Sequence, residues 1–273
     1  MIPDPAPTVR QLLAFYLEAG VDCALADEPV NRLSDPEVAP AASGMAPAQP
    51  PTLAKAAVAK PAIAAPRGEP APAPDVAIAS AREAARTAPT LAALRALLEN
   101  FEGCALKNTA TRLVFADGNP QARIMFVGEA PGREEDIEGL PFVGRSGKLL
   151  DRMIGAIGLD RSKAYIANVI PWRPPGNRTP TPQETQICLP FVLRQIELAD
   201  PDILVCLGGP SAQTLLGIKD GITKTRGRWF TFNSGKRDIR AIATFHPAFL
   251  LRSPLQKRFA WRDFLSVKKA LAE

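Results

Sequence analysis

The sequence predicts an α/β fold, a three-layer α/β/α sandwich around a four-stranded, mainly parallel sheet. Beyond residue 110, short apolar runs with the length of strands alternate with longer runs whose apolar residues recur at helical spacing. Strands that alternate with helices are joined by crossovers, which cover a parallel sheet with helices on both faces. A chain of 273 residues has room for one such domain and for appended segments.

Two N-terminal segments are expected to lie outside this domain. Residues 1–36 are predicted to form a small helical element, with an N-cap at Thr8 and with Leu12 and Tyr16 on one apolar face. Residues 37–79 contain 16 Ala and nine Pro but no aromatic side chain, so we expect a disordered Ala/Pro-rich linker.

The elements of the expected α/β domain, residues 80–273, follow from apolar periodicity and from helix-start signals. Strands are predicted at 123–127, 164–170, 202–207 and 238–245. Helices are predicted near 80–98, from Ser146, from Thr181 and over 257–271. The start at Thr181 is well marked, because a threonine N-cap is followed by proline and by the glutamate of a capping box.

Composition excludes several classes of protein. No stretch approaches the about 18 apolar residues of a membrane span, and the N-terminus lacks the basic and apolar regions of a signal peptide. We therefore expect a cytoplasmic protein with no membrane partner. The four cysteines are too few and too scattered for a disulfide framework; they are Cys23, Cys104, Cys188 and Cys206.

Charge is distributed unevenly along the chain. Residues 219–262 carry 11 Lys and Arg against two acidic residues, whereas residues 1–36 carry six acidic residues and two basic ones. A concentrated basic segment indicates a polyanionic partner such as nucleic acid. Solvated surface charge is the alternative explanation.

Polar side chains follow two of the predicted strands at the point where each strand ends. His246, the single histidine of the chain, follows strand 238–245, and Glu129 follows strand 123–127 within the turn 128–132. In open parallel sheets, ligands bind at the carboxyl ends of the strands. A glycine-rich turn also lets backbone amides approach a ligand closely, although this turn lacks the spacing of a dinucleotide fingerprint. The alternative is a histidine that simply packs in the core or lies on the surface.

Further motifs complete the pattern. Phe142 lies in a glycine-rich loop, Asn168 lies near the end of a predicted strand, and His246-Pro247 opens a leucine-containing loop. Over residues 101–267, these ordered motifs resemble the uracil-DNA glycosylase superfamily, specifically its family 4, the bacterial and archaeal iron–sulfur type.

The resemblance implies an enzyme that hydrolyses the N-glycosidic bond of uracil flipped out of DNA, which initiates base excision repair. The implied catalytic residues are His246, Glu129 and Asn168, which would stabilise the departing uracil, position the attacking water and read the uracil edge, respectively. The implied substrate-binding residues are Gly128, Ala130, Pro131, Gly132, Phe142 and Asn168. The implied DNA-binding residues are Arg145, Ala248, Leu250, Leu251 and Arg252. Either Leu250 or Leu251 would fill the vacated base stack.

The sequence departs from the family in its metal site. Family 4 enzymes carry a 4Fe-4S cluster on four cysteines, and the matching positions here are Phe101, Cys104, Trp172 and Cys188. Such a cluster normally needs four thiolates. We therefore expect that the cluster is lost, that the two aromatic side chains fill its volume, and that the protein needs no cofactor.

Other interpretations stay open at this point. Phe142 could be a core residue, Asn168 a turn residue at a strand end, and Glu129 a helix or turn cap. The chain could also be a catalytically silent DNA-binding relative that acts as a scaffold through its N-terminal element. A covalent uracil-DNA crosslinker is disfavoured, because such relatives use an additional histidine in an inserted basic loop. We expect a monomer in which residues 1–36 could bind a protein partner.

Overall fold

The computed structural model describes residues 74–273. The helical element expected at residues 1–36 and most of the linker expected at residues 37–79 lie outside the described residues. Among the helices of residues 74–273, none combines the length and the apolar character that a membrane span requires.

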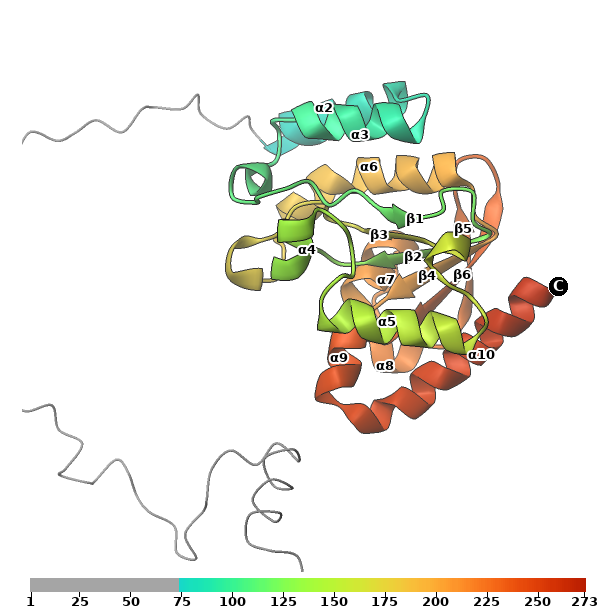
Figure 1. Cartoon of the computed structure of the whole chain (residues 1–273). Coiled ribbons are helices and arrows are strands. Elements are labelled where there is room, and N and C mark those ends of the chain that lie inside the picture. Colours follow the sequence, from blue (N-terminus) through green and yellow to red (C-terminus); the bar gives the residue numbers. More distant parts are fainter. Residues whose placement is uncertain (1–73) are drawn as a thin grey trace, which may run out of the picture. The chain divides into compact units, whose positions relative to one another are not determined.

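A six-stranded sheet forms the middle layer of this region (Figure 1). Its strands are β1 (Asp117–Gly118), β2 (Ile124–Gly128), β3 (Tyr165–Asn168), β4 (Ile203–Leu207), β5 (Trp229–Asn233) and β6 (Asp238–Thr244). The strand order is β1-β3-β2-β4-β6-β5, in which β3, β2, β4 and β6 run parallel. The predicted α/β fold with a mainly parallel sheet is confirmed, and the four predicted strands form its centre. The count of four is too low, because β1 and β5 add antiparallel edges.

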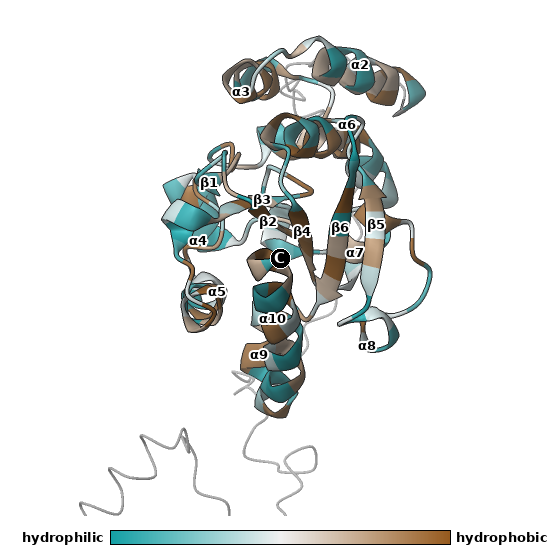
Figure 2. Cartoon of the chain, turned by 90° about the vertical axis from the view of Figure 1, so that its right-hand side faces the viewer, coloured by the Kyte–Doolittle hydropathy of each residue, from teal (hydrophilic) through white to brown (hydrophobic). Residues whose placement is uncertain are grey.

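Helices cover both faces of the sheet. They are α2 (Pro74–Thr87), α3 (Leu91–Asn100), α4 (Arg133–Glu138), α5 (Arg145–Ala156), α6 (Pro182–Ala199), α7 (Gly209–Leu216), α8 (Ile222–Thr225), α9 (Pro247–Arg252) and α10 (Lys257–Ala272). One apolar cluster joins α2, α3, α6 and α7 to one face, and a second joins α5 and α10 to the other. Figure 2 shows the hydrophobic strands between these helical layers.

The N-terminal helices differ from the single helix expected near residues 80–98. The structure has two helices here, and α2 begins at Pro74, within the expected linker. The break falls at Ala88-Pro89-Thr90. Proline disfavours a helical conformation in the residue before it, and the Thr90 side chain caps α3 by accepting a hydrogen bond from the amide of Ala93 at 3.1 Å.

The helix start predicted at Thr181 is confirmed. The Thr181 hydroxyl accepts a hydrogen bond from the amide of Glu184 at 3.2 Å, and the Glu184 carboxylate accepts one from the amide of Thr181 at 2.7 Å. This reciprocal pair is the predicted capping box. The C-terminal helix also agrees with its prediction, since α10 extends over Lys257–Ala272.

The register of the sheet brings the functional strand ends together. Gly128 pairs with Asn168 across β2 and β3, and Leu207 pairs with Thr244 across β4 and β6. The four parallel strands therefore end at the same edge. Because Glu129 follows β2 and His246 follows β6, both side chains come to this edge, where open parallel sheets bind ligands.

Candidate active site

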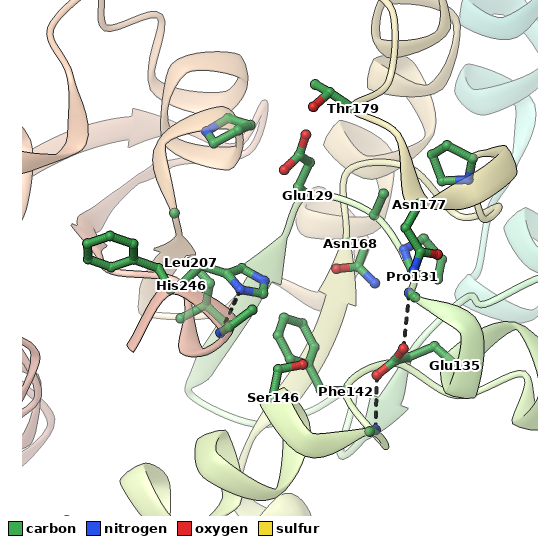
Figure 3. A pocket seen from close by; sticks show the side chains of 18 of the residues that line it. Glu129, Pro131, Glu135, Phe142, Ser146, Asn168, Asn177, Thr179, Leu207 and His246 are labelled. Carbon is green, nitrogen blue, oxygen red and sulfur yellow. Dashed lines mark hydrogen bonds between the residues drawn. The ribbon is translucent and has the colours of Figure 1, made fainter. Parts of the chain in front are cut away.

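A cavity of about 840 Å³ opens at the carboxyl ends of the parallel strands. The predicted residues Glu129, Phe142, Asn168 and His246 all line it (Figure 3). Other predicted residues that line the cavity are Ala130, Pro131, Gly132, Arg145, Ala248, Leu251 and Arg252. The structure thus gathers residues that are more than 100 positions apart in the chain.

Asn168 has an unusual environment at the end of β3. Its side chain is buried, and within residues 74–273 its Oδ1 is the single buried side-chain nitrogen or oxygen without a hydrogen-bond partner. Leaving such an atom unpaired costs about 1–3 kcal/mol, so native proteins rarely do so without a functional reason. An acceptor held in this way is suited to a ligand that brings its own donor.

Gly128 packs closely against this acceptor. A Cβ atom at position 128 would lie 2.4 Å from Oδ1 of Asn168 and 2.6 Å from Cζ of Phe142. Any larger side chain would therefore collide with both groups. Glycine is therefore required at this position, because the carboxamide of Asn168 and the ring of Phe142 pack closely against its backbone.

Phe142 lines the cavity, and its ring centre is 5.5 Å from the ring centre of His246. Its backbone adopts a left-handed conformation with φ of 55°, which is unfavourable for a bulky residue. Such strain persists only where the surroundings enforce it. The aromatic ring is buried, so it is both part of the core and the wall of the cavity.

His246 is held by the start of α9. Its Nδ1 accepts a hydrogen bond from the amide of Ala248 at 3.1 Å, so the neutral ring carries its proton on Nε2. Burial, together with the positive charge of Arg252, lowers the pKa of His246 to about 4. The imidazole is therefore neutral near pH 7 and can act as a hydrogen-bond donor through Nε2.

Glu129 follows β2 directly and is partly buried at the upper side of the cavity in Figure 3. Its carboxylate points toward Thr179 rather than toward Asn168. Burial raises the pKa of Glu129 above its usual value of 4.5. A carboxyl group with a raised pKa is a better proton acceptor once ionised than one in open water.

The burial of Leu250 does not fit its predicted contact with DNA. Its side chain is only 1% exposed and packs in an apolar cluster with Phe245 and Ala260. The α9 helix turns this residue inward, whereas Leu251 and Arg252 line the cavity. Of the two leucines considered for filling a base stack, only Leu251 has an accessible side chain at the site.

The four positions that match the family's cluster cysteines all belong to the same large apolar cluster of the core. Cys104 and Cys188 lie with their sulfur atoms 3.9 Å apart, and both are buried. Phe101 packs edge-on against Phe191 at 5.0 Å, and Trp172 is 2% exposed. Two thiols and two aromatic rings do not fit a 4Fe-4S cluster, which takes four thiolates. Within the described part of the chain, no group of three or more His, Cys, Asp or Glu side chains could hold a metal ion.

Several residues with a clear structural role at the site were missed by sequence reasoning. Asn177 lines the cavity with a left-handed backbone, and Glu135 connects two of the loops that line it. Arg161 reaches the loop of Phe142 from a distant short helix. Glu135 lies in an acidic run next to a glycine, a pattern that equally fits an exposed helix start, so the sequence carried no distinct signal for it.

Comparison with known proteins supports the resemblance. Residues 115–265 match the family described as the Uracil DNA glycosylase superfamily. The chain is 41% identical over 168 residues to a type-4 uracil-DNA glycosylase of Archaeoglobus fulgidus, covering 60% of this chain and 84% of that protein. It is 46% identical over 151 residues to a type-4 uracil-DNA glycosylase of Thermotoga maritima, covering 55% and 77%. A third such enzyme, from Saccharolobus solfataricus, is 42% identical over 174 residues, covering 62% and 81%.

Proposed function

The chain belongs to the uracil-DNA glycosylase superfamily, and on this premise we propose that it is a monofunctional uracil-DNA glycosylase. It hydrolyses the bond between N1 of uracil and C1′ of deoxyribose after the base has been flipped out of DNA, and it thereby initiates base excision repair. Water supplies the oxygen that bonds to C1′. Uracil leaves with the electron pair of the broken bond.

The observation that carries this proposal is the unpartnered Oδ1 of Asn168 in a cavity that the ring of Phe142 also lines. Uracil presents an N3–H donor next to an O4 acceptor, and one carboxamide offers the complementary acceptor and donor. Cytosine presents the reverse pattern, so it would leave Asn168 mismatched. Phe142 offers the aromatic surface on which a flipped base stacks.

His246 stabilises the leaving group. Negative charge develops on O2 of uracil as the bond to C1′ lengthens, and the Nε2–H of a neutral imidazole donates a hydrogen bond there. Because the ring is already oriented by Ala248, no reorganisation is needed in the transition state.

Glu129 acts on the other side of the broken bond. Its carboxylate positions the attacking water and stabilises the positive charge that develops on the sugar. The backbone of the following turn, Ala130-Pro131-Gly132, contacts the uracil.

DNA is held at the mouth of the cavity. Arg145 and Arg252 are exposed there and contact phosphates, with Ala248 beside them. Leu251 fills the stack that the flipped base leaves, in place of the buried Leu250.

The proposal also includes the loss of the family's metal cluster and of any need for a cofactor. Phe101 and Trp172 fill the volume as an apolar plug, with Cys104 and Cys188 packed beside them. The catalytic domain includes α2 and thus residues 74–273, and it works as a cytoplasmic monomer. Residues 1–36 bind a protein partner through a linker that ends before residue 74.

The test is incubation of the purified chain with an oligonucleotide that contains one uracil, followed by alkali, which cleaves abasic sites. Strand cleavage by the wild type, and its loss in both His246→Ala and Asn168→Ala, supports the proposal. DNA binding without cleavage by the wild type would instead favour the alternative, a catalytically silent scaffold protein.

A further inference from the structure

One peptide unit in the loop before α5, the unit that joins Phe142 to Val143, is held at both ends by charged side chains. The guanidinium of Arg161 donates a hydrogen bond to the carbonyl oxygen of Phe142. The Glu135 carboxylate accepts one from the amide of Val143 at 3.1 Å. The carbonyl and the amide belong to the same planar unit, so the unit cannot rotate without breaking both bonds.

Glu135 holds more than this peptide. The same oxygen, Oε1, accepts a hydrogen bond from the amide of Gly144 at 3.1 Å, and Oε2 accepts one from the amide of Gly132 at 3.0 Å (Figure 3). Glu135 is only 6% exposed, so these bonds replace the water that its carboxylate has lost. Glu135 thereby connects the loop of Phe142 to the turn that follows Glu129.

Arg161 is anchored in a comparable way. Besides Phe142, its guanidinium donates to the carbonyl of Pro141 at 3.1 Å. It also pairs with the carboxylates of Asp117 at 2.5 Å and Asp151 at 2.8 Å. These two ion pairs fix the guanidinium plane, so that it meets the two loop carbonyls in one orientation.

These contacts hold the backbone of Phe142 in its strained, left-handed conformation. A φ of 55° at a residue with a large side chain costs of order 1–3 kcal/mol unless its surroundings enforce it. Gly147 in α5 also permits it, because a Cβ there would lie 1.7 Å from the carbonyl oxygen of Phe142. The result is an aromatic ring placed beside Gly128 and opposite the imidazole of His246.

We propose that Glu135 and Arg161 are positioning residues that hold Phe142 where it stacks on the flipped uracil. This inference rests on the proposed function. Arg161 does not line the cavity and acts through the carbonyl of Phe142. Glu135 does line the cavity, but its oxygens already accept three amide hydrogen bonds, so it acts through the backbone of the two loops that it holds. Their role is therefore distinct from that of Glu129, whose carboxylate faces the cavity.

Double-mutant cycles test this role. Glu135→Gln and Arg161→Lys are measured alone and combined with Phe142→Ala, with kcat/KM for uracil release as the readout. Each single variant should lose about 10- to 100-fold, because a ring displaced by about 1 Å no longer stacks correctly. In the Phe142→Ala background Arg161→Lys should cost less than about threefold, since the group through which it acts is gone. Glu135→Gln should cost less there than it does alone, with a remaining loss from its contact with Gly132. Additive losses, or no loss in the single variants, would overturn the proposal.

Binding provides a second readout that does not depend on turnover. The variants should bind DNA with an uncleavable 2′-fluoro-deoxyuridine more weakly than the wild type does, because that base still stacks on Phe142. They should bind DNA with a tetrahydrofuran abasic analogue as the wild type does, because no base is present. Equal loss on both DNAs would show a general structural defect and would also overturn the proposal.

The matched control is Arg237→Lys, because Arg237 also pairs with two carboxylates, Asp200 and Asp202, and donates to two loop carbonyls, but does not line the cavity. This variant should stay within about twofold of wild-type kcat/KM, as is usual for an exposed ion pair. A wild type that releases no uracil would overturn the proposed function itself. If the wild type is active but the losses in the double variants equal the product of the single-variant losses, only the positioning role would be overturned.

Discussion

Nδ1 of His246 accepts a hydrogen bond from the amide of Ala248, and this contact assigns the ring proton to Nε2. The imidazole faces the cavity next to Phe142 (Figure 3). A histidine that is already neutral and oriented can donate to a developing oxyanion without first losing or gaining a proton. The low pKa of about 4 keeps it in this state across the physiological range.

The first prediction concerns pH and stability. The folded pKa of His246, about 4, lies below its ordinary value of 6.5, so the unfolded chain binds this proton more readily. The contribution of His246 to the free energy of unfolding should therefore be complete above about pH 6.5 and should be lost as the pH falls toward 4. Denaturant unfolding of wild type and His246→Ala at several pH values measures it. An identical pH dependence in the two proteins would contradict the buried, neutral imidazole.

The second prediction concerns Glu129. Because burial raises the pKa of its carboxyl group above 4.5, the rate of uracil release should rise with pH through that raised value as the carboxylate forms. Glu129→Gln should lower kcat by about 10²- to 10⁴-fold and remove this acid limb. A pH–rate profile of both proteins is the measurement. If the variant kept the acid limb, another group would be responsible for it.

The third prediction separates activity from stability at Asn168. Its Oδ1 has no partner, so Asn168→Ala should change the free energy of unfolding by less than about 1 kcal/mol while abolishing uracil release. Gln195 is the matched control, since its buried amide donates to the carbonyl of Phe115 and to the hydroxyl of Tyr165. Gln195→Ala should lose about 1–3 kcal/mol of stability and keep its activity. The opposite pattern would mean that Asn168 is a structural residue.

The fourth prediction concerns the aromatic plug. Trp172 is almost fully buried, so Trp172→Ala should lower the free energy of unfolding by about 3–5 kcal/mol. Trp261→Ala, at a tryptophan that is 44% exposed, should cost about 1 kcal/mol or less. Wild-type activity should also survive prolonged treatment with an iron chelator. Inactivation by the chelator, or iron bound in the purified protein, would contradict the loss of the cluster.

The fifth prediction concerns DNA binding. Arg252 is exposed at the mouth of the cavity, so Arg252→Ala should reduce the slope of log K against log salt concentration by about one. Arg95, which is exposed on α3 and pairs with Glu99, provides the control. Arg95→Ala should leave the slope unchanged. Equal slopes for Arg252→Ala and the wild type would exclude a phosphate contact by Arg252.

Sequence reasoning captured the parts of the fold that depend on local pattern. The four central strands are mainly apolar, and α6 has the capping box at Thr181 and Glu184, so both features follow from residues close together in the chain. The edge strand β5 was missed, because it lies within a strongly basic segment and pairs with only one neighbour, β6. Such a strand forms because it pairs with the edge of the sheet, and its own sequence does not have the apolar pattern of a strand.

The site likewise has features that follow from local sequence and features that follow from tertiary packing. Residues at strand ends, such as Glu129 and Asn168, could be placed because parallel strands end at one edge. The burial of Leu250 depends on which way the short helix α9 turns, and the contacts of Glu135 depend on how two loops meet. Such features arise from tertiary packing, and no local sequence pattern predicts them.

The central claim is that this chain removes uracil from DNA with Asn168, His246 and Glu129 at one cavity. The most direct measurement is chromatographic detection of the free base after incubation with two duplexes that differ only in one uracil or cytosine. The account predicts free uracil from the first duplex, no cytosine from the second, and no uracil from Asn168→Ala or His246→Ala. Wild-type protein that binds the uracil duplex but releases no base would contradict it.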